Sequence, residues 1–175
     1  MKPDPRELLQ QAWVVNDLEA AARRWSETVG IGPFYLADYK PEFFTDVSYR
    51  GSPGVMQMRT AICYSGGVQI ELIQPTGTGP SCYRDTVPQG QEAFHHVCYW
   101  THDLEADIAA YASRGCPVAN RGRVRNGPGF AYLDASRSVG CMIELLEYSE
   151  RLAGVFDGWR ANCAAWRGGE LFVRR

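Results

Sequence analysis

The segments GVQIELIQP (residues 67–75) and GCMIELLEY (residues 140–148) decide the fold, because both begin with the pattern Gly-x-x-Ile-Glu-Leu. A second motif, Asp-Leu-Glu-Ala, precedes each of them, at residues 17–20 and again at residues 103–106. Two motifs that recur in the same order indicate an internal repeat, and a repeat constrains the architecture more strongly than any single motif. The chain therefore reads as a duplicated module.

The two copies predict the same order of elements, β-α-β-β-β, followed by a helix that has no counterpart in the first copy. We expect an α+β fold in which two tandem βαβββ modules form a curved mixed sheet shaped as a cup, with a C-terminal helix added. The modules are placed at residues 1–76 and 93–148, with a linker at 77–92 and the C-terminal helix and tail at 149–175, all in one structural domain. Strands are expected at residues 8–15, 34–39, 55–64, 68–74, 95–100, 117–119, 130–134 and 141–148.

The first helix shows clear start and stop signals. Asn16 is expected to cap its first turn, with Glu19 completing a capping box, and Gly30 is expected to end it. The C-terminal helix is expected to cover an edge of the sheet or to support a dimer contact. We therefore expect a homodimer.

The composition excludes several classes of function. Of the 175 residues, 45% are hydrophobic and 22% are charged, and the net charge is −2. This balance gives no basic surface for nucleic acid, and no apolar run reaches the roughly 20 residues that cross a bilayer. We expect a cytoplasmic protein that binds neither nucleic acid nor membrane, and whose six cysteines are reduced and pack as small apolar side chains.

Alternation along the strands predicts which side chains share a face. Gln10 and His96 each stand seven residues before an Asp-Leu pair, and Glu71 and Glu144 each lie between two apolar residues that should pack under a helix. Because successive side chains in a strand point to opposite faces, all four should point into the cup. By the same argument His95 should face the helix side and be structural.

These four side chains suit a divalent cation. Two carboxylates neutralise its charge, which makes burial tolerable, and three oxygens with one nitrogen suit Zn²⁺, Ni²⁺, Co²⁺ or Mn²⁺. An ion with open positions would polarise a carbonyl oxygen of a substrate. Glu71 or Glu144 would then act as the catalytic group that moves a proton at the adjacent carbon.

The chain also resembles the vicinal oxygen chelate superfamily, which includes glyoxalase I, methylmalonyl-CoA epimerase, extradiol dioxygenases and bleomycin-resistance proteins. The resemblance lies closest to the glyoxalase-like and epimerase-like branch. It rests on QQAWVVNDLEAAARRW, VGIGPF, GGVQIELIQP, SCYRDTVPQGQEAFHHVCYW, GFAYLDAS and GCMIELLEY. It implies one metal ligand on each terminal strand of each half, by position Gln10, Glu71, His96 and Glu144. That set is similar to the set of eukaryotic-type glyoxalase I.

The resemblance implies a metal-dependent isomerase or lyase of the glyoxalase or epimerase type. Such an enzyme transfers a proton next to a metal-bound carbonyl, through an enolate or enediolate, on a small molecule with a carbonyl or vicinal oxygens. One alternative is an Fe(II)-dependent extradiol-type dioxygenase, although Gln10 stands where those enzymes have a His, which argues against O₂ chemistry. The other alternative is a non-catalytic, resistance-type binding protein.

Candidate substrate contacts come from aromatic and cationic side chains near the predicted cup. We expect the loops at residues 41–55 and 119–129 to form its walls. The first loop makes module one the longer copy, because 54 positions separate Asp17 from Glu71 but only 41 separate Asp103 from Glu144. The expected substrate-binding residues are Phe44, Arg59, Trp100, Phe130 and Tyr132, and Arg121, Arg123 and Arg125 are further candidates for an anionic group.

Overall fold

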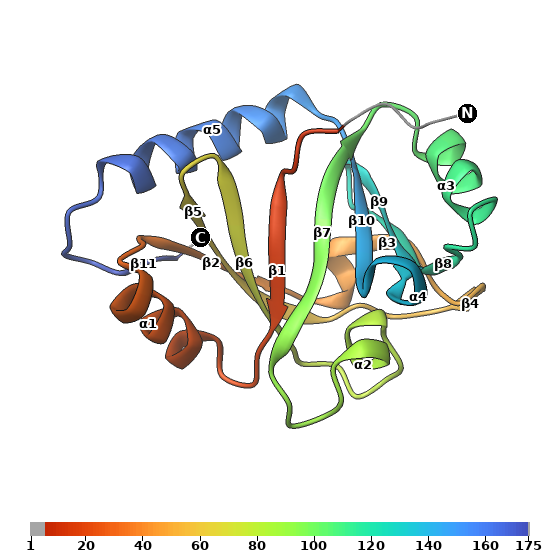
Figure 1. Cartoon of the computed structure of the whole chain (residues 1–175), viewed down its shortest axis with the longest axis horizontal. Helices are drawn as coiled ribbons and strands as arrows, with labels where there is room; N and C mark the ends of the chain where they lie inside the picture. Colours follow the sequence, from red (N-terminus) through yellow and green to blue (C-terminus); the bar gives the residue numbers. More distant parts are fainter. Residues whose placement is uncertain (1–5, 175) are drawn as a thin grey trace.

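Both halves of the chain fold in the order that the repeat predicts (Figure 1). The structure is a computed structural model and describes residues 6–174. The first half holds β1 (Gln10–Val14), α1 (Leu18–Val29), β2 (Phe34–Tyr39), β5 (Met58–Ser65) and β6 (Val68–Pro75). The second half holds β7 (Ala93–Thr101), α3 (Leu104–Ala112), β8 (Val118–Val124), β9 (Gly129–Ala135) and β10 (Cys141–Glu147). The expected α+β class is confirmed, whereas the residue limits proposed for modules and linker stay predictions.

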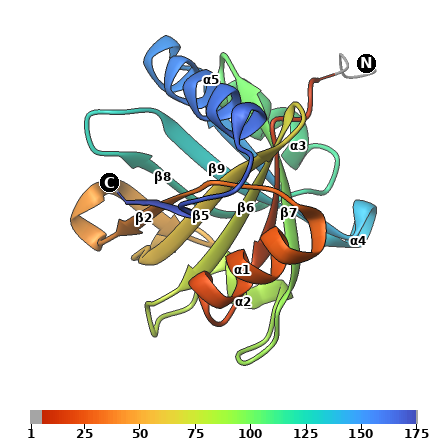
Figure 2. The ribbon, with the colours of Figure 1, turned by 90° about the vertical axis from the view of Figure 1, so that its left-hand side faces the viewer.

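The strands form a single curved, open sheet across the described residues, with the order β11-β2-β5-β6-β1-β7-β10-β9-β8-β3-β4. In each half the first strand pairs in parallel with the last, β1 with β6 and β7 with β10. The two first strands pair antiparallel with each other and so join the halves at the centre. Figure 2 shows the curvature of this sheet. The polar residues of all four central strands are thereby brought to one region.

The helices of the two halves cover the same face of the sheet. Leu18, Ala21 and Ala22 of α1 pack with buried residues of β5 and β6, and Leu104 of α3 packs with β9 and β10. The expected cap at Asn16 is wrong by one residue. The side chain of Asp17 accepts a hydrogen bond from the backbone N–H of Ala20, as Asp103 does for Ala106. An Asp carboxylate serves this position well because it also interacts favourably with the positive end of the helix dipole.

Three segments expected to be irregular, the two wall loops and the linker, contain ordered elements. The first wall loop contains a short 3-10 helix (Pro41–Phe43), then β3 (Phe44–Tyr49) and β4 (Ser52–Pro53), and β3 pairs with β8 of the other half. The second wall loop is largely β8 itself. The linker contains α2 (Cys82–Thr86), whose Cys82 and Tyr83 are buried, and a one-turn helix, α4 (Ser136–Val139), precedes β10. The walls of the cup are therefore built mostly from strands.

The C-terminal helix α5 (Glu150–Ala165) lies across the sheet beside β5 (Figure 1). Trp159 stacks on Tyr35 with ring centroids 4.6 Å apart, and Phe156 packs in the same cluster. The edge of the sheet is covered by a different element, β11 (Phe172–Arg174), which pairs with β2. The helix therefore does not cover this edge of the sheet.

Two expectations from composition have structural counterparts. All six cysteines are free, and five of them are buried. Within residues 6–174, no helix combines the length and apolar character needed to cross a membrane.

Candidate metal centre

Three of the four predicted ligands converge at the centre of the sheet. Glu71 on β6, His96 on β7 and Glu144 on β10 each offer one ligand atom, and these atoms lie within 4.8 Å of one another. The Nε2 atom of His96 lies 3.0 Å from a carboxylate oxygen of Glu144 and 3.8 Å from one of Glu71. All three residues are buried. The duplicated motifs therefore meet at one point.

The strand register explains this convergence. Ala12 on β1 lies opposite Glu71 on one side and His96 on the other, and Cys98 on β7 lies between Gln10 and Glu144. Ala12 and Cys98 are fully buried. Cross-strand partners share a face of the sheet, and small residues between the polar ones leave space for longer side chains to meet.

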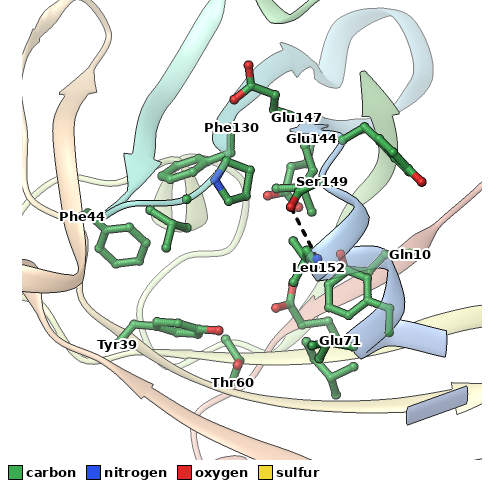
Figure 3. A pocket seen from close by; sticks show the side chains of 18 of the residues that line it. Gln10, Tyr39, Phe44, Thr60, Glu71, Phe130, Glu144, Glu147, Ser149 and Leu152 are labelled. Carbon is green, nitrogen blue, oxygen red and sulfur yellow. Dashed lines mark hydrogen bonds between the residues drawn. The ribbon is translucent and has the colours of Figure 1, made fainter. Parts of the chain in front are cut away.

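Gln10 borders this group. It is buried on β1, its side chain counteracts part of the rise in the pKa of Glu71, and it lines the same cavity as Glu71 and Glu144 (Figure 3). All four predicted ligands thus lie on one face of the sheet, as alternation along the strands predicts.

The expected orientation of His95 is wrong. The register between β1 and β7 shifts after Ala12, so that His95 occupies a β-bulge, and a bulge redirects a side chain. Its ring lies against the rings of His96, Tyr83 and Tyr132 instead of on the face covered by α1 and α3. Val97, which follows the bulge, does pack on the helix side.

The bulge fixes the proton on the ring of His96. The Nε2 atom of His95 lies 3.0 Å from the carbonyl oxygen of Cys82, which can only accept, so this nitrogen carries a proton. Burial lowers the pKa of His95 to about 3, so its ring is neutral and its Nδ1 accepts. The Nδ1 of His96, 2.9 Å away, is then the donor. The Nε2 of His96 consequently presents a lone pair toward the two carboxylates.

These residues fit a divalent cation. The Nε2 atom of His96 is buried and has no hydrogen-bond partner in the part of the chain that the structure describes, although a Glu144 oxygen lies close to it. Over residues 6–174, neither Glu71 nor Glu144 forms an ion pair with Lys or Arg. Burial, and next the charge of Glu144, raise the pKa of Glu71 well above its ordinary value. A cation between the three groups would satisfy the lone pair and both carboxylates at once.

The centre opens into a cavity of about 600 Å³. Among the residues expected to bind substrate, Phe44, Phe130 and Tyr132 line it. Leu152, Val155, Phe156 and Trp159 of α5 form a further wall that was not predicted, since their helical spacing is equally typical of packing on a sheet edge. The C-terminal helix therefore helps to enclose the cavity.

The remaining expected contacts lie elsewhere. Trp100 does not line this cavity, and its ring packs against Phe156 and Tyr148. Arg59 points away from the cup and donates hydrogen bonds to Gln74 and Glu19. The other candidate cations also have partners: Arg121 pairs with Glu105, Arg123 pairs with Glu147, and Arg125 donates to the carbonyl of Glu42.

Comparison with known families gives one match over most of the chain. The family described as the Glyoxalase/Bleomycin resistance protein/Dioxygenase superfamily matches residues 9–132. That range includes Gln10, Glu71 and His96 but ends before Glu144. No curated protein matches the chain.

Solved structures with the same fold include methylmalonyl-CoA epimerases. The enzyme from Mycobacterium tuberculosis is 17% identical, with a TM-score of 0.57 over 84% of this chain and 91% of that one. An epimerase variant from Streptomyces coelicolor, in complex with 2-nitronate-propionyl-CoA, is 20% identical, with a TM-score of 0.57 over 82% of this chain and 98% of its own. At this identity the likeness concerns the fold. The likeness leaves part of this chain without a counterpart in the epimerases, because it covers 84% and 82% of it in these two comparisons.

Proposed function

Because the chain belongs to the glyoxalase/bleomycin resistance/dioxygenase superfamily, we propose that it is a divalent-metal-dependent isomerase or lyase acting on a small carbonyl compound. The observation that carries this proposal is the buried group of Glu71, His96 and Glu144, which has one free imidazole lone pair and, within residues 6–174, no Lys or Arg partner. A purely structural cluster would normally be neutralised by Lys or Arg. We assign both ion binding and proton transfer to the two glutamates.

Gln10, Glu71, His96 and Glu144 would hold the ion. The mixed oxygen and nitrogen donors suit Zn²⁺, Ni²⁺, Co²⁺ or Mn²⁺. When bound, such an ion supplies Lewis acidity that polarises a carbonyl oxygen and makes the neighbouring C–H bond more acidic.

The protein's own groups would then move the proton. Glu71 and Glu144 both face the cavity, so either carboxylate can reach a carbon of a molecule bound there. The raised pKa of Glu71 shows that its surroundings favour the protonated form when the ion is not bound. A general acid and base of this kind works best when its pKa lies near the operating pH.

A metal-free binding protein is the second candidate. The apolar walls of the cavity and its partial enclosure by α5 favour this alternative, because apolar enclosure alone gives affinity for a small molecule. The dioxygenase alternative has no comparable support. The homodimer and the cytoplasmic location stay predictions.

The deciding experiment measures metal binding and proton exchange together. The protein is purified without chelator, its metal content is determined by elemental analysis, and Mn²⁺ affinity is measured by calorimetry. Removal of a group that only supports a metal ligand commonly lowers metal affinity by about 10–100-fold. Glu144 is proposed as a ligand itself, so Glu144→Gln should lower Mn²⁺ affinity by more than about 100-fold. Glu105→Gln, at an exposed site on α3, should leave the affinity unchanged.

Proton transfer is then followed by NMR in deuterated water, with 2-oxo acids as probes. Wild-type protein loaded with Mn²⁺ should introduce deuterium at the carbon next to the carbonyl faster than Glu71→Gln or Glu144→Gln. Metal binding without any exchange would argue against the enzyme, and absence of metal binding would favour the metal-free alternative.

A further inference from the structure

Thr60 lines the cavity, and within residues 6–174 its hydroxyl group has no hydrogen-bond partner. Thr60 is on β5, is 2% exposed and lines the same cavity as the candidate metal ligands (Figure 3). Its Oγ1 atom is buried and makes no hydrogen bond to any residue between 6 and 174. Buried polar atoms are nearly always satisfied in folded proteins, so an unsatisfied one that faces a cavity indicates a missing partner.

The strand register places this hydroxyl close to the metal centre. Ile62 lies directly opposite Glu71 on the neighbouring strand, and Thr60 is two residues before Ile62 on the same face. Diagonal neighbours of this kind are about 7–8 Å apart. A molecule held at the three ligands can therefore reach Thr60 with an oxygen that is only a few bonds away.

The space around Thr60 is apolar. Tyr39, Met58 and Phe130 lie on the sheet side of the cavity, and Val155 and Phe156 of α5 lie among the lining residues as well. Arg151 is the only cationic residue among those that line the cavity in the described chain, and it is exposed. The interior is therefore suited to an uncharged apolar group, with Thr60 as an additional polar contact.

We propose that Thr60 determines specificity by donating a hydrogen bond to a third oxygen of the substrate, beyond the two oxygens held at the metal centre. The substrate class is a 2-oxo acid or similar vicinal-oxygen compound that carries a further carbonyl or hydroxyl group and an uncharged aromatic or branched body. The body fills the space between the sheet and α5. This inference rests on the proposed function, because the first two oxygens are assigned to the metal centre.

Two probes isolate the third oxygen. Both 2,4-dioxo-4-phenylbutanoate and 2-oxo-4-phenylbutanoate offer vicinal oxygens and a phenyl group, but only the first has a second carbonyl. Their dissociation constants are measured by calorimetry with Mn²⁺-loaded protein. Thr60→Val should lower the preference for the dioxo acid by about tenfold, the value of a typical buried hydrogen bond, whereas Thr60→Ser should retain it. The comparison between variants cancels the different chelating strengths of the probes.

Thr86→Val is the matched control. The Oγ1 of Thr86 is also buried without a partner, but Thr86 lies on α2 and does not line the cavity. Neither valine variant should melt below the wild type, and Thr86→Val should keep the full preference.

The outcomes separate the two proposals. Binding of the probes that requires Mn²⁺ but shows the same preference in Thr60→Val overturns the role of Thr60 and leaves the metal centre standing. Failure of the wild type to bind Mn²⁺ overturns the proposed function and this inference with it. Binding of Mn²⁺ without binding of either probe overturns the substrate class alone.

Discussion

The two halves of the sheet place their polar side chains alike but support them differently. Gln10 and Glu71 in the first half match His96 and Glu144 in the second, and all four share one face of the sheet. His96, however, is held through its Nδ1 by His95, and where β1 pairs with β7 the extra residue of the bulge lies on β7, the strand of the second half. The repeat therefore specifies position, and the second half adds control of the ligand's tautomer.

The connections differ even more than the ligands. Residues 40–57 join β2 to β5 and include β3, which crosses to β8, whereas residues 125–128 join the equivalent strands β8 and β9 directly. The shared elements build the candidate metal centre, and the elements that lack a counterpart (β3, α2 and α5) build or support the cavity. The following experiments test that division.

The largest effect on stability should come from removing the side chain of Asn120, which connects the second half to β3 and α2 by hydrogen bonds. This buried side chain accepts a hydrogen bond from the backbone N–H of Cys82 on α2 (2.7 Å) and donates one to the carbonyl of Ser48 on β3 (3.0 Å). Asn120→Ala leaves both backbone groups unpaired and should lower the free energy of unfolding by about 3 kcal/mol. For a chain of this size, that lowers Tm by about 6–12 °C.

Thermal and urea unfolding measure this loss. Asn162→Ala is the control, because Asn162 makes one hydrogen bond to Tyr35 from an exposed position on α5. Equal losses in the two variants would show that β3 and α2 are not tied to the second half through Asn120.

A smaller effect is expected from His95, which distinguishes the two ligand pairs. His95→Phe removes the acceptor for the Nδ1 proton of His96 and should weaken Mn²⁺ binding by about tenfold, the lower end of the range for such supporting groups. His95→Gln keeps a donor and an acceptor and should recover part of the loss. Calorimetry gives both affinities, and unfolding in chelator shows whether the fold is intact.

An unchanged affinity in His95→Phe, with the fold intact, would mean that the second half holds its ligand no more firmly than the first. A large loss in His95→Gln as well would indicate that the bulge itself, more than its hydrogen bonds, positions His96.

The sequence could predict the repeat and its polar face because both depend on local rules. Alternation places Glu71 and Glu144 opposite their apolar neighbours, and that holds wherever a strand is regular. For His95 the same rule predicts the wrong face of the sheet, because a bulge breaks the alternation. Nothing local in the run EAFHHVCYW indicates the bulge. Regular alternation also fails along β3, because Asp46 has a positive φ of 55° and the register with β8 shifts between Thr45 and Ser48. Its partner strand lies in the other half, so the pairing has no local signal.

The sequence pattern of α5 does not reveal that the helix lines the cavity, for a related reason. An apolar helical face shows that the helix packs on something, but Phe156 and Trp159 satisfy that pattern equally well at an edge or over a cavity. The orphan hydroxyl of Thr60 has no sequence signal either, because threonine is common in strands. The roles of α5 and of Thr60 become visible only from contacts between residues far apart in the sequence.

The smallest effect should come from Glu71, the carboxyl group of the first half. Burial, and then the charge of Glu144, raise its pKa well above its ordinary value of 4.5. A raised pKa in the folded state means that stability is full below the unfolded value and is lost as the pH rises toward the folded value. Glu71→Gln removes this loss, so in chelator the variant should exceed the wild type by about 1 kcal/mol at pH 8, or about 2–4 °C in Tm. The gain should shrink as the pH falls to 5. Glu27→Gln, on the exposed side of α1, should show no such trend.

Saturating Mn²⁺ should reverse the order of stability, so that the wild type melts above Glu71→Gln, because binding to the folded state stabilises only the protein that keeps the ligand. A gain that is the same at every pH would show that Glu71 is not strained by its charge, and the first half would then contribute a neighbour to the centre and no electrostatic driving force for binding the ion.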